Sequence, residues 1–67
     1  MQAGVKNRFT GKITSIKSDG IMSQVTVQAG DNVITSVMTT ESLNEAGFKE
    51  GDTATALVKA INVVLIK

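Results

Sequence analysis

Cysteine, histidine, proline, tryptophan and tyrosine are all absent from this chain of 67 residues. Without cysteine and histidine it has no zinc finger, thiol nucleophile, imidazole base or Ser-His-Asp triad. It also cannot form a disulfide, and only carboxylates remain as weak metal ligands. Chains below roughly 70–80 residues rarely gain enough stability from one core, and they add a disulfide, a metal or further subunits. These absences predict an oligomer before any motif is considered.

Charge argues against a nucleic-acid-binding protein, and hydropathy argues against a membrane-spanning one. Seven cationic and six anionic residues give a formal net charge of +1, which neither repels nor strongly attracts nucleic acid. No run of about 18 apolar residues is present, so no segment is expected to cross a membrane as a helix. Residues 1–6 lack the apolar stretch of a secretion signal. We therefore expect one cytoplasmic domain over residues 1–67.

β-Branched residues are the most prominent feature of the composition. Valine, isoleucine and threonine account for 22 of the 67 residues, and these types favour pleated strands over helices. Turn signals at Ser18-Asp19-Gly20 and Gly30-Asp31-Asn32 divide the first half. The pattern predicts strands at about 8–17, 21–29, 32–39, 53–59 and 63–66, with a short helix at 41–46. This order matches an all-β, OB-like Greek-key barrel of five strands.

Side-chain alternation adds two expectations. Ile13 and Ile16 have opposite parity within the first strand, which a bulge near Thr14-Ser15 explains. The strands at 32–39 and 63–66 are apolar on both faces, and such strands need cover on both sides. One short helix cannot cover them all, so the spare face predicts burial against another copy. The alternative is that one face points into the barrel and the other lies under the helix.

The ends of the helix have recognisable signals. Thr40 or Ser42 is expected to cap its N-terminus, because Ser42 and Glu45 have the spacing of a capping box. Gly47 suits the left-handed position just beyond its C-terminus.

Catalysis is disfavoured by where the acidic residues lie. All of them occupy turn signals, where they cap backbone amides, or the first turns of the helix, where the helix dipole favours anions. Lysine is then the sole base available to the serines and threonines. No G-x-S-x-G, G-x-x-x-x-G-K-[ST] or G-x-G-x-x-G motif occurs. We expect a binding or structural protein and not an enzyme. The acidic residues are Asp19, Asp31, Glu41, Glu45, Glu50 and Asp52.

Nucleic-acid binding is an alternative that the composition disfavours. OB-like barrels stack bases on aromatic side chains along a cationic path. Phe9 and Phe48 are the two aromatic residues here, and both suit positions in the core.

A small anion needs a different set of groups, namely donors without acceptors. Lys6, Arg8 and Lys12 lie near the start of the chain, and Lys59 stands alone in an apolar stretch at the end of the fourth strand. Lys59 can equally be a strand-end lysine that extends into water and keeps the chain soluble. The residues alone leave both interpretations open.

Four segments, in this order, are similar to those of the molbindins, small oxyanion-binding proteins of the Mop/TOBE type. Residues 5–13 resemble the family's opening S-A-R-N-Q-L-x-G-x-[IV], and residues 32–39 resemble an I-T-S-I-I-[ST] segment. Residues 42–51 resemble S-x-x-x-L-G-[VL]-x-x-G, and residues 59–65 resemble K-[AS]-[ST]-x-V-[MS]-[LIV]. The resemblance implies a homo-hexamer, a trimer of dimers, that binds molybdate or tungstate where subunits meet. It implies intracellular storage of the anion and no catalytic cofactor.

The resemblance also implies which residues hold the anion. Lys59 of one subunit and Lys6 of a neighbour would supply charge. Backbone N–H groups around Val5 and Ala60 would donate hydrogen bonds, and Ile61 occupies the next position of the family's motif. Ser23 is a candidate for a second inter-subunit site, with a solvated serine on the outer face as the alternative.

The chain departs from the family pattern at three of these positions. The opening serine falls at Gly4 and the closing serine or threonine at Ile61, so two hydroxyls are absent. The family's arginine falls at Lys6, which keeps the charge without the bidentate fork. A second hypothesis is therefore a structural or interaction module of the same fold that has lost anion binding.

Overall fold

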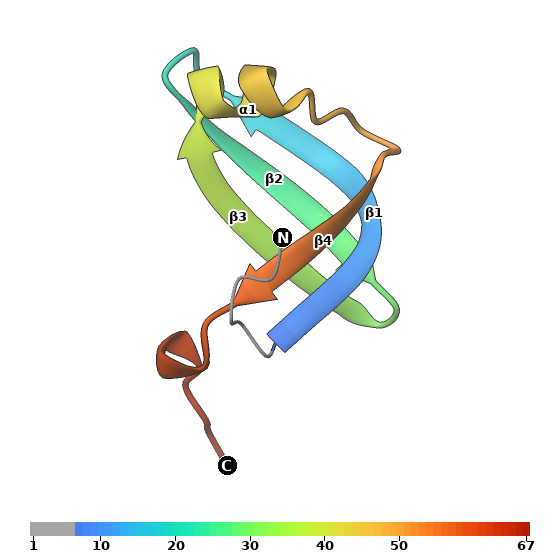
Figure 1. Cartoon of the computed structure of the whole chain (residues 1–67), viewed down its shortest axis with the longest axis vertical. Coiled ribbons are helices and arrows are strands. Elements are labelled where there is room, and N and C mark those ends of the chain that lie inside the picture. Colours follow the sequence, from blue (N-terminus) through green and yellow to red (C-terminus); the bar gives the residue numbers. More distant parts are fainter. Residues whose placement is uncertain (1–6) are drawn as a thin grey trace.

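Four antiparallel strands curl around a small apolar interior, and one helix lies across an end of the curl (Figure 1). The computed structural model describes residues 7–67. In chain order the elements are β1 (Asn7–Ser18), β2 (Met22–Ala29), β3 (Asn32–Thr39), α1 (Thr40–Ala46), β4 (Thr53–Val58) and the 3₁₀ turn η1 (Ala60–Asn62). Within these residues, neither helix is long and apolar enough to cross a membrane.

The long strand β1 joins the two halves of the sheet, whose order is β3-β2-β1-β4. Its first part, Asn7 to Lys12, pairs with β4, and its second part, Lys12 to Ser18, pairs with β2. Gly11 lies where one pairing gives way to the other. A Cβ atom there would come within 2.8 Å of the Ala29 Cα atom, so the close approach of β1 and β2 requires glycine.

The predicted bulge in β1 is confirmed. Ile13 pairs with Val27 and Ser15 pairs with Thr26, so Thr14 is the extra residue. Because the bulge changes the parity of the strand, Ile13 before it and Ile16 after it both face the interior.

The buried core is small. Ile13, Val25, Val27 and Leu43 form one cluster, against which Ile16, Met38 and Ala54 pack as partly buried neighbours. Leu43 is the buried residue that α1 contributes, so the helix acts as a plug at one end of the curled sheet. Phe48, which the sequence placed in the core, is 36% exposed.

The helix is capped one residue earlier than predicted. Thr39 is the N-cap, and its hydroxyl accepts a hydrogen bond of 3.1 Å from the Ser42 N–H. Thr40 cannot serve because it is already helical and its hydroxyl faces Ser23. The prediction for Gly47 is confirmed: its φ is 73°, and its N–H donates to the Leu43 carbonyl over 3.0 Å.

The loop between α1 and β4 is tied to the bulge of β1. Gly51 donates its N–H to the Ile13 carbonyl over 2.8 Å, and the Ile13 N–H donates to the Asp52 carbonyl over 2.9 Å. On the far side of the bulge, the carboxylate of Glu50 accepts the Ile16 N–H over 2.9 Å. These bonds set the position from which β4 begins.

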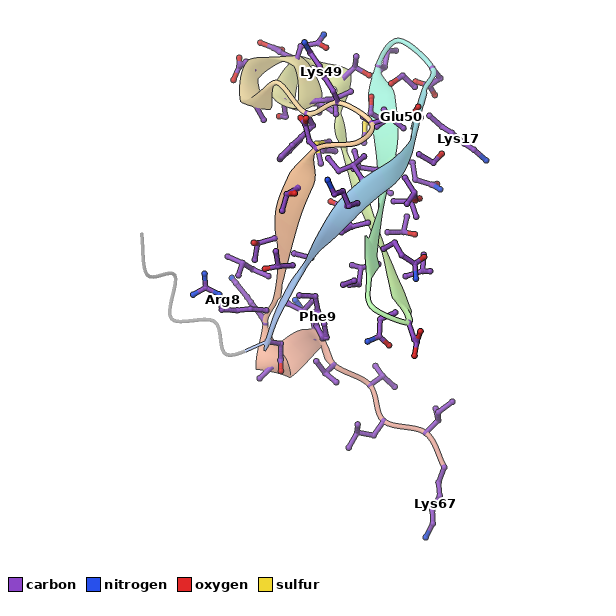
Figure 2. The ribbon with its side chains drawn as sticks, turned by 90° about the vertical axis from the view of Figure 1, so that its right-hand side faces the viewer. Arg8, Phe9, Lys17, Lys49, Glu50 and Lys67 are labelled. Atoms are coloured by element: carbon purple, nitrogen blue, oxygen red, sulfur yellow. The ribbon has the colours of Figure 1, made fainter. Side chains whose placement is uncertain are left out.

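The expected fifth strand is not formed within residues 7–67. Residues 63–66 instead form a tail that projects from the sheet, with Lys67 at its end (Figure 2). Val64, Leu65 and Ile66 are 84%, 88% and 95% exposed. The segment is strongly apolar, but a strand needs a hydrogen-bonding neighbour, and this one has none in the described part of its own chain. The fourth strand also ends at Val58, one residue earlier than predicted.

Candidate functional site

The end of β4 carries the residues that the sequence singled out for anion binding. Lys59 directly follows the strand and is the N-cap of η1, where its side chain makes no capping hydrogen bond. The turn closes through the Asn62 N–H on the Lys59 carbonyl, over 2.9 Å, and the Val63 N–H on the Ala60 carbonyl, over 3.2 Å. N–H groups at the start of such a turn have no acceptor inside it. Lys59, Ala60 and Ile61 are all exposed, so this end of the fold presents backbone donors beside one cation.

Asn7 fixes this end of β4 against β1. It pairs with Val58 in the sheet register, and its side-chain amide donates to the Val58 carbonyl over 3.1 Å. The position of Lys59 is thus set by a hydrogen bond one residue away. Sequence reasoning missed this role, because nothing in the spacing of Asn7 indicates which backbone group its amide meets.

Three other positions of the expected site, Gly4, Val5 and Lys6, lie outside the described residues. The structure brings Lys59, Ala60 and Ile61 together, while the contributions of Val5 and Lys6 stay predictions.

Ser23 is buried, so the alternative of a solvated serine on the outer face is wrong. It is 2% exposed, and its hydroxyl lies 2.7 Å from those of both Ser18 and Thr40. The signal was present in the sequence, because Ser23 has the same parity as the inward-facing Val25 and Val27. The three hydroxyls join β1, β2 and the start of α1.

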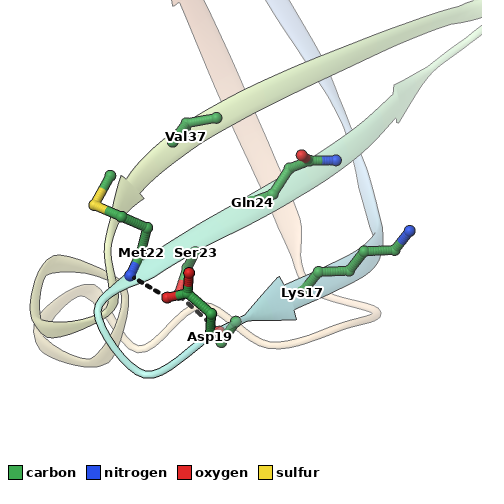
Figure 3. A pocket seen from close by; sticks show the side chains of 7 residues that line it. Lys17, Asp19, Met22, Ser23, Gln24 and Val37 are labelled. Carbon is green, nitrogen blue, oxygen red and sulfur yellow. Dashed lines mark hydrogen bonds between the residues drawn. The ribbon is translucent and has the colours of Figure 1, made fainter.

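A hollow of about 320 Å³ lies beside Ser23 at the turn between β1 and β2 (Figure 3). Lys17 and Asp19 both line it. A carboxylate at this place repels an oxyanion and offsets the attraction of the lysine. Lys59 follows the end of β4 that pairs with the start of β1, whereas Lys17 lies near the other end of β1. The residues next to Lys59 in the sequence, Val58 and Ala60, carry no carboxylate. The Lys59 end therefore suits an oxyanion better than this hollow does.

The carboxylate of Asp19 has a structural task in that turn. It accepts the N–H groups of Met22, over 2.8 Å, and Ile21, over 3.0 Å. These hydrogen bonds favour the charged form, and they hold the pKa of Asp19 below its usual value of 3.8.

Comparison with known proteins identifies the family. The sequence profile of the TOBE domain matches residues 5–65. The chain belongs to the TOBE domain family. The predicted resemblance is thereby confirmed, and it covers the elements from β1 to the tail.

Relatives of this TOBE domain carry names that refer to molybdenum. Molybdenum-pterin-binding proteins 1 and 2 of Clostridium pasteurianum are each 34% identical over 67 residues, and the match covers 98% of both chains. The molybdenum transport protein ModE of Herbaspirillum seropedicae is 37% identical over 98% of this chain, which corresponds to 25% of the longer protein.

Solved structures agree with the fold of this TOBE domain. MopII of Clostridium pasteurianum superposes with a TM-score of 0.87 at 34% identity, covering 94% of this chain and 96% of that one. The cytoplasmic molybdate-binding protein ModG, solved with molybdate bound, superposes with a TM-score of 0.88 at 32% identity, covering 96% of this chain and 46% of ModG. A molybdate-binding protein of Sporomusa ovata, at 22% identity, shares the fold with a TM-score of 0.91.

Proposed function

We propose that this protein binds a tetrahedral oxyanion, molybdate or tungstate, at the interfaces of a homo-oligomer, and stores it in the cytoplasm without chemical change. The observation that carries the proposal is the exposure of Lys59, Ala60 and Ile61 at one end of the fold, in a chain whose relatives are named as molybdenum-pterin-binding and molybdate-binding proteins. The cytoplasmic description of ModG supports the proposed location.

The proposed mechanism is electrostatic capture. An oxyanion without a proton only accepts hydrogen bonds, so it needs cations and N–H donors around it. Lys59 and Lys6 supply the charge, and backbone N–H groups around Val5 and Ala60 supply the donors. Lys59 belongs to one subunit and Lys6 to a neighbour in this proposal, so the two charges meet only in the oligomer.

Exposure of the site in a single chain supports its completion by neighbouring subunits. A dianion beside one exposed lysine in water gains little, because the solvent screens the attraction. Enclosure by further copies, in a trimer of dimers, removes water and adds lysines. Two like charges brought together cost energy in the empty oligomer, and the anion relieves that cost, so anion and assembly should stabilise each other.

Ser23 stays a prediction for a second inter-subunit site. Its hydroxyl already bonds to Ser18 and Thr40, so the main site is proposed without it.

Thermal unfolding with sodium molybdate, tungstate and sulfate tests the proposal. We expect molybdate or tungstate to raise the melting temperature of the wild-type protein, and Lys59→Ala to abolish the rise. Lys17→Ala is the matched control, because it removes an exposed lysine near the end of β1 that is far from Lys59. An assembly that gives no heat in titration calorimetry with either anion near millimolar concentration would contradict anion binding. That result would favour the alternative, a structural module that still assembles but has lost anion binding.

A further inference from the structure

All the charged side chains of the four strands belong to β1. The strands β2, β3 and β4 contain no charged residue, and β1 contains three exposed cations, Arg8, Lys12 and Lys17, without an acid. Every acidic residue of the chain lies in a turn, in a loop or in α1. The outer face of the sheet therefore carries positive charge that no carboxylate of the strands balances.

Arg8 is the cation of β1 that lies nearest in register to Lys59. Arg8 pairs with Leu57 across the two strands, and the next pair joins Asn7 to Val58. Lys59 follows with extended backbone angles, φ −65° and ψ 137°, so the alternation of β4 continues through it. Lys59 therefore leaves the strand on the same face as Arg8. Diagonal neighbours of this kind have Cα atoms roughly 7–8 Å apart, a distance that long side chains span.

The side chain of Arg8 is directed away from the interior. Figure 2 shows Arg8 and Phe9 on opposite sides of β1, and Phe9 is the one that is partly buried. Neutral groups hold this end of β1 against β4, namely the Asn7 amide on the Val58 carbonyl and the hydroxyl pair of Thr10 and Thr55. The strands are thus joined here without the charge of Arg8.

Two cations on one face favour an oxyanion between them. They repel each other, and neither β1 nor β4 supplies a carboxylate that would relieve the repulsion. Arg8 is also the sole arginine of the chain. Its guanidinium presents a planar fork of N–H donors that matches two oxygens, whereas a lysine ammonium acts as a point charge. Since Lys6 lacks such a fork, Arg8 is the residue that can supply one.

We propose that Arg8 is an anion-binding residue, whose guanidinium donates two hydrogen bonds to one edge of the oxyanion that Lys59 of the same chain attracts. The assignment rests on the proposed function and adds a residue to its site. Each chain then brings a fork and a point charge on one face, before a neighbouring subunit contributes Lys6.

Calorimetric titration of the wild-type assembly and its variants with sodium molybdate tests the role of Arg8. Arg8→Gln and Lys12→Gln each remove one cation from the same face of β1. Lys12 is four residues farther along, about 13 Å, which exceeds the Debye length of about 8 Å at 0.15 M salt. We expect Arg8→Gln to weaken the affinity about tenfold or more, and Lys12→Gln less than about twofold. Equal affinities of these two variants would overturn the assignment.

The variant Arg8→Lys tests the fork apart from the charge. It keeps the cation and loses the bidentate geometry, so its affinity for molybdate should fall between those of the wild type and Arg8→Gln. An affinity equal to that of the wild type would overturn the fork.

Thermal unfolding distinguishes a ligand-binding arginine from a structural one. Without molybdate, at about 10 mM salt, Arg8→Gln should melt at or above the wild-type temperature, because the repulsion from Lys59 is removed. With molybdate, the melting temperature should rise less in Arg8→Gln than in the wild type. A variant that melts lower without molybdate and shows the full wild-type rise with it would assign Arg8 to the fold and overturn the proposal.

The role of Arg8 and the proposed function fail in different ways. A wild-type assembly that gives no heat with molybdate would contradict anion binding, and the role of Arg8 with it. Wild-type binding that Arg8→Gln weakens no more than Lys12→Gln does would contradict the role of Arg8 alone.

Discussion

Gly11 of β1 passes so close to Gln28 of β2 that a methyl group on Gly11 would overlap the Gln28 carbonyl group. The obstacle is backbone on a paired strand and not the end of a flexible side chain, so it cannot move aside cheaply. The approach lies where β1 leaves β4 and continues with β2. The curl of the sheet therefore depends on one missing side chain.

Substitution of Gly11 by alanine is expected to separate β1 from β2 locally. Overpacking of this kind costs about 1–3 kcal/mol, and backbone obstacles fall at the upper end. Urea unfolding followed by circular dichroism, at one fixed protein concentration, measures the loss. Lys12→Ala is the control, because the next residue is exposed and points to the other face. Equal stability of Gly11→Ala and the wild type would contradict the close approach.

Ser23→Ala is expected to lower the free energy of unfolding by about 1–3 kcal/mol, because the buried Ser23 hydroxyl is lost and two partly buried hydroxyl bonds are lost with it. Ser18→Ala should cost less, since Ser18 is more exposed and water can replace it. The rise in melting temperature with molybdate should persist in Ser23→Ala. Disappearance of that rise, with the fold retained, would instead assign Ser23 to an anion site.

The turn at Asp19 should weaken in acid. Because the folded-state pKa lies below the usual 3.8, the ionised carboxylate stabilises the fold above the unfolded-state pKa, and this contribution is lost as pH falls from about 4 through the lower folded-state value. Asp19→Asn keeps a side-chain oxygen but does not titrate. The stability difference between wild type and Asp19→Asn should therefore shrink as pH falls below about 4. A carboxyl carbon NMR titration of Asp19 with a midpoint at or above 3.8 would contradict the assignment.

Asn7→Ala is expected to weaken molybdate binding without touching the anion. Loss of the hydrogen bond to the Val58 carbonyl frees the end of β4 next to Lys59. A bond of this kind is worth about 0.5–1.5 kcal/mol, which corresponds to a roughly 2- to 12-fold weaker affinity by calorimetry. Thr10→Ala is a matched control, because it removes the 2.9 Å hydroxyl pair with Thr55 between the same strands, farther from Lys59. Equal losses in both variants would indicate general loosening of the sheet.

Much of the fold follows from local patterns in the sequence. The bounds of β2 and β3 agree with the prediction to within a residue, because turn signals flank both strands. The bulge followed from Ile13 and Ile16, since one extra residue is the simplest way to bring two side chains of opposite parity to one face.

The missed features depend on contacts that no local pattern specifies. Three hydroxyl residues, Thr39, Thr40 and Ser42, all satisfy the rule for an N-cap. The choice fell to Thr39 because the Thr40 hydroxyl meets Ser23 from a distant strand. The tail at 63–66 has the composition of a strand, but a strand also needs a paired neighbour, and composition does not specify one.

The sequence predicted that Lys59, Ala60 and Ile61 belong to the candidate site, but not the hydrogen bond from Asn7 that holds their strand in place. Lys59, Ala60 and Ile61 are consecutive, so their proximity follows from the chain itself. The anchoring of their strand by Asn7 spans 51 residues, and it is visible only once β1 and β4 lie side by side.

The bulge at Thr14 makes β1 sensitive to its length more than to its composition. Thr14 is exposed, so many side chains would fit there. Deletion of that one residue would reverse the side-chain alternation of the strand on one side of the deletion. Either Ile13 or Ile16 would then turn to the solvent, together with the other inward-facing residues on its side. Since β1 pairs with β2 on one stretch and β4 on another, one lost residue would put the two stretches out of phase. Across related sequences, this stretch should vary freely in identity while its residue count stays constant.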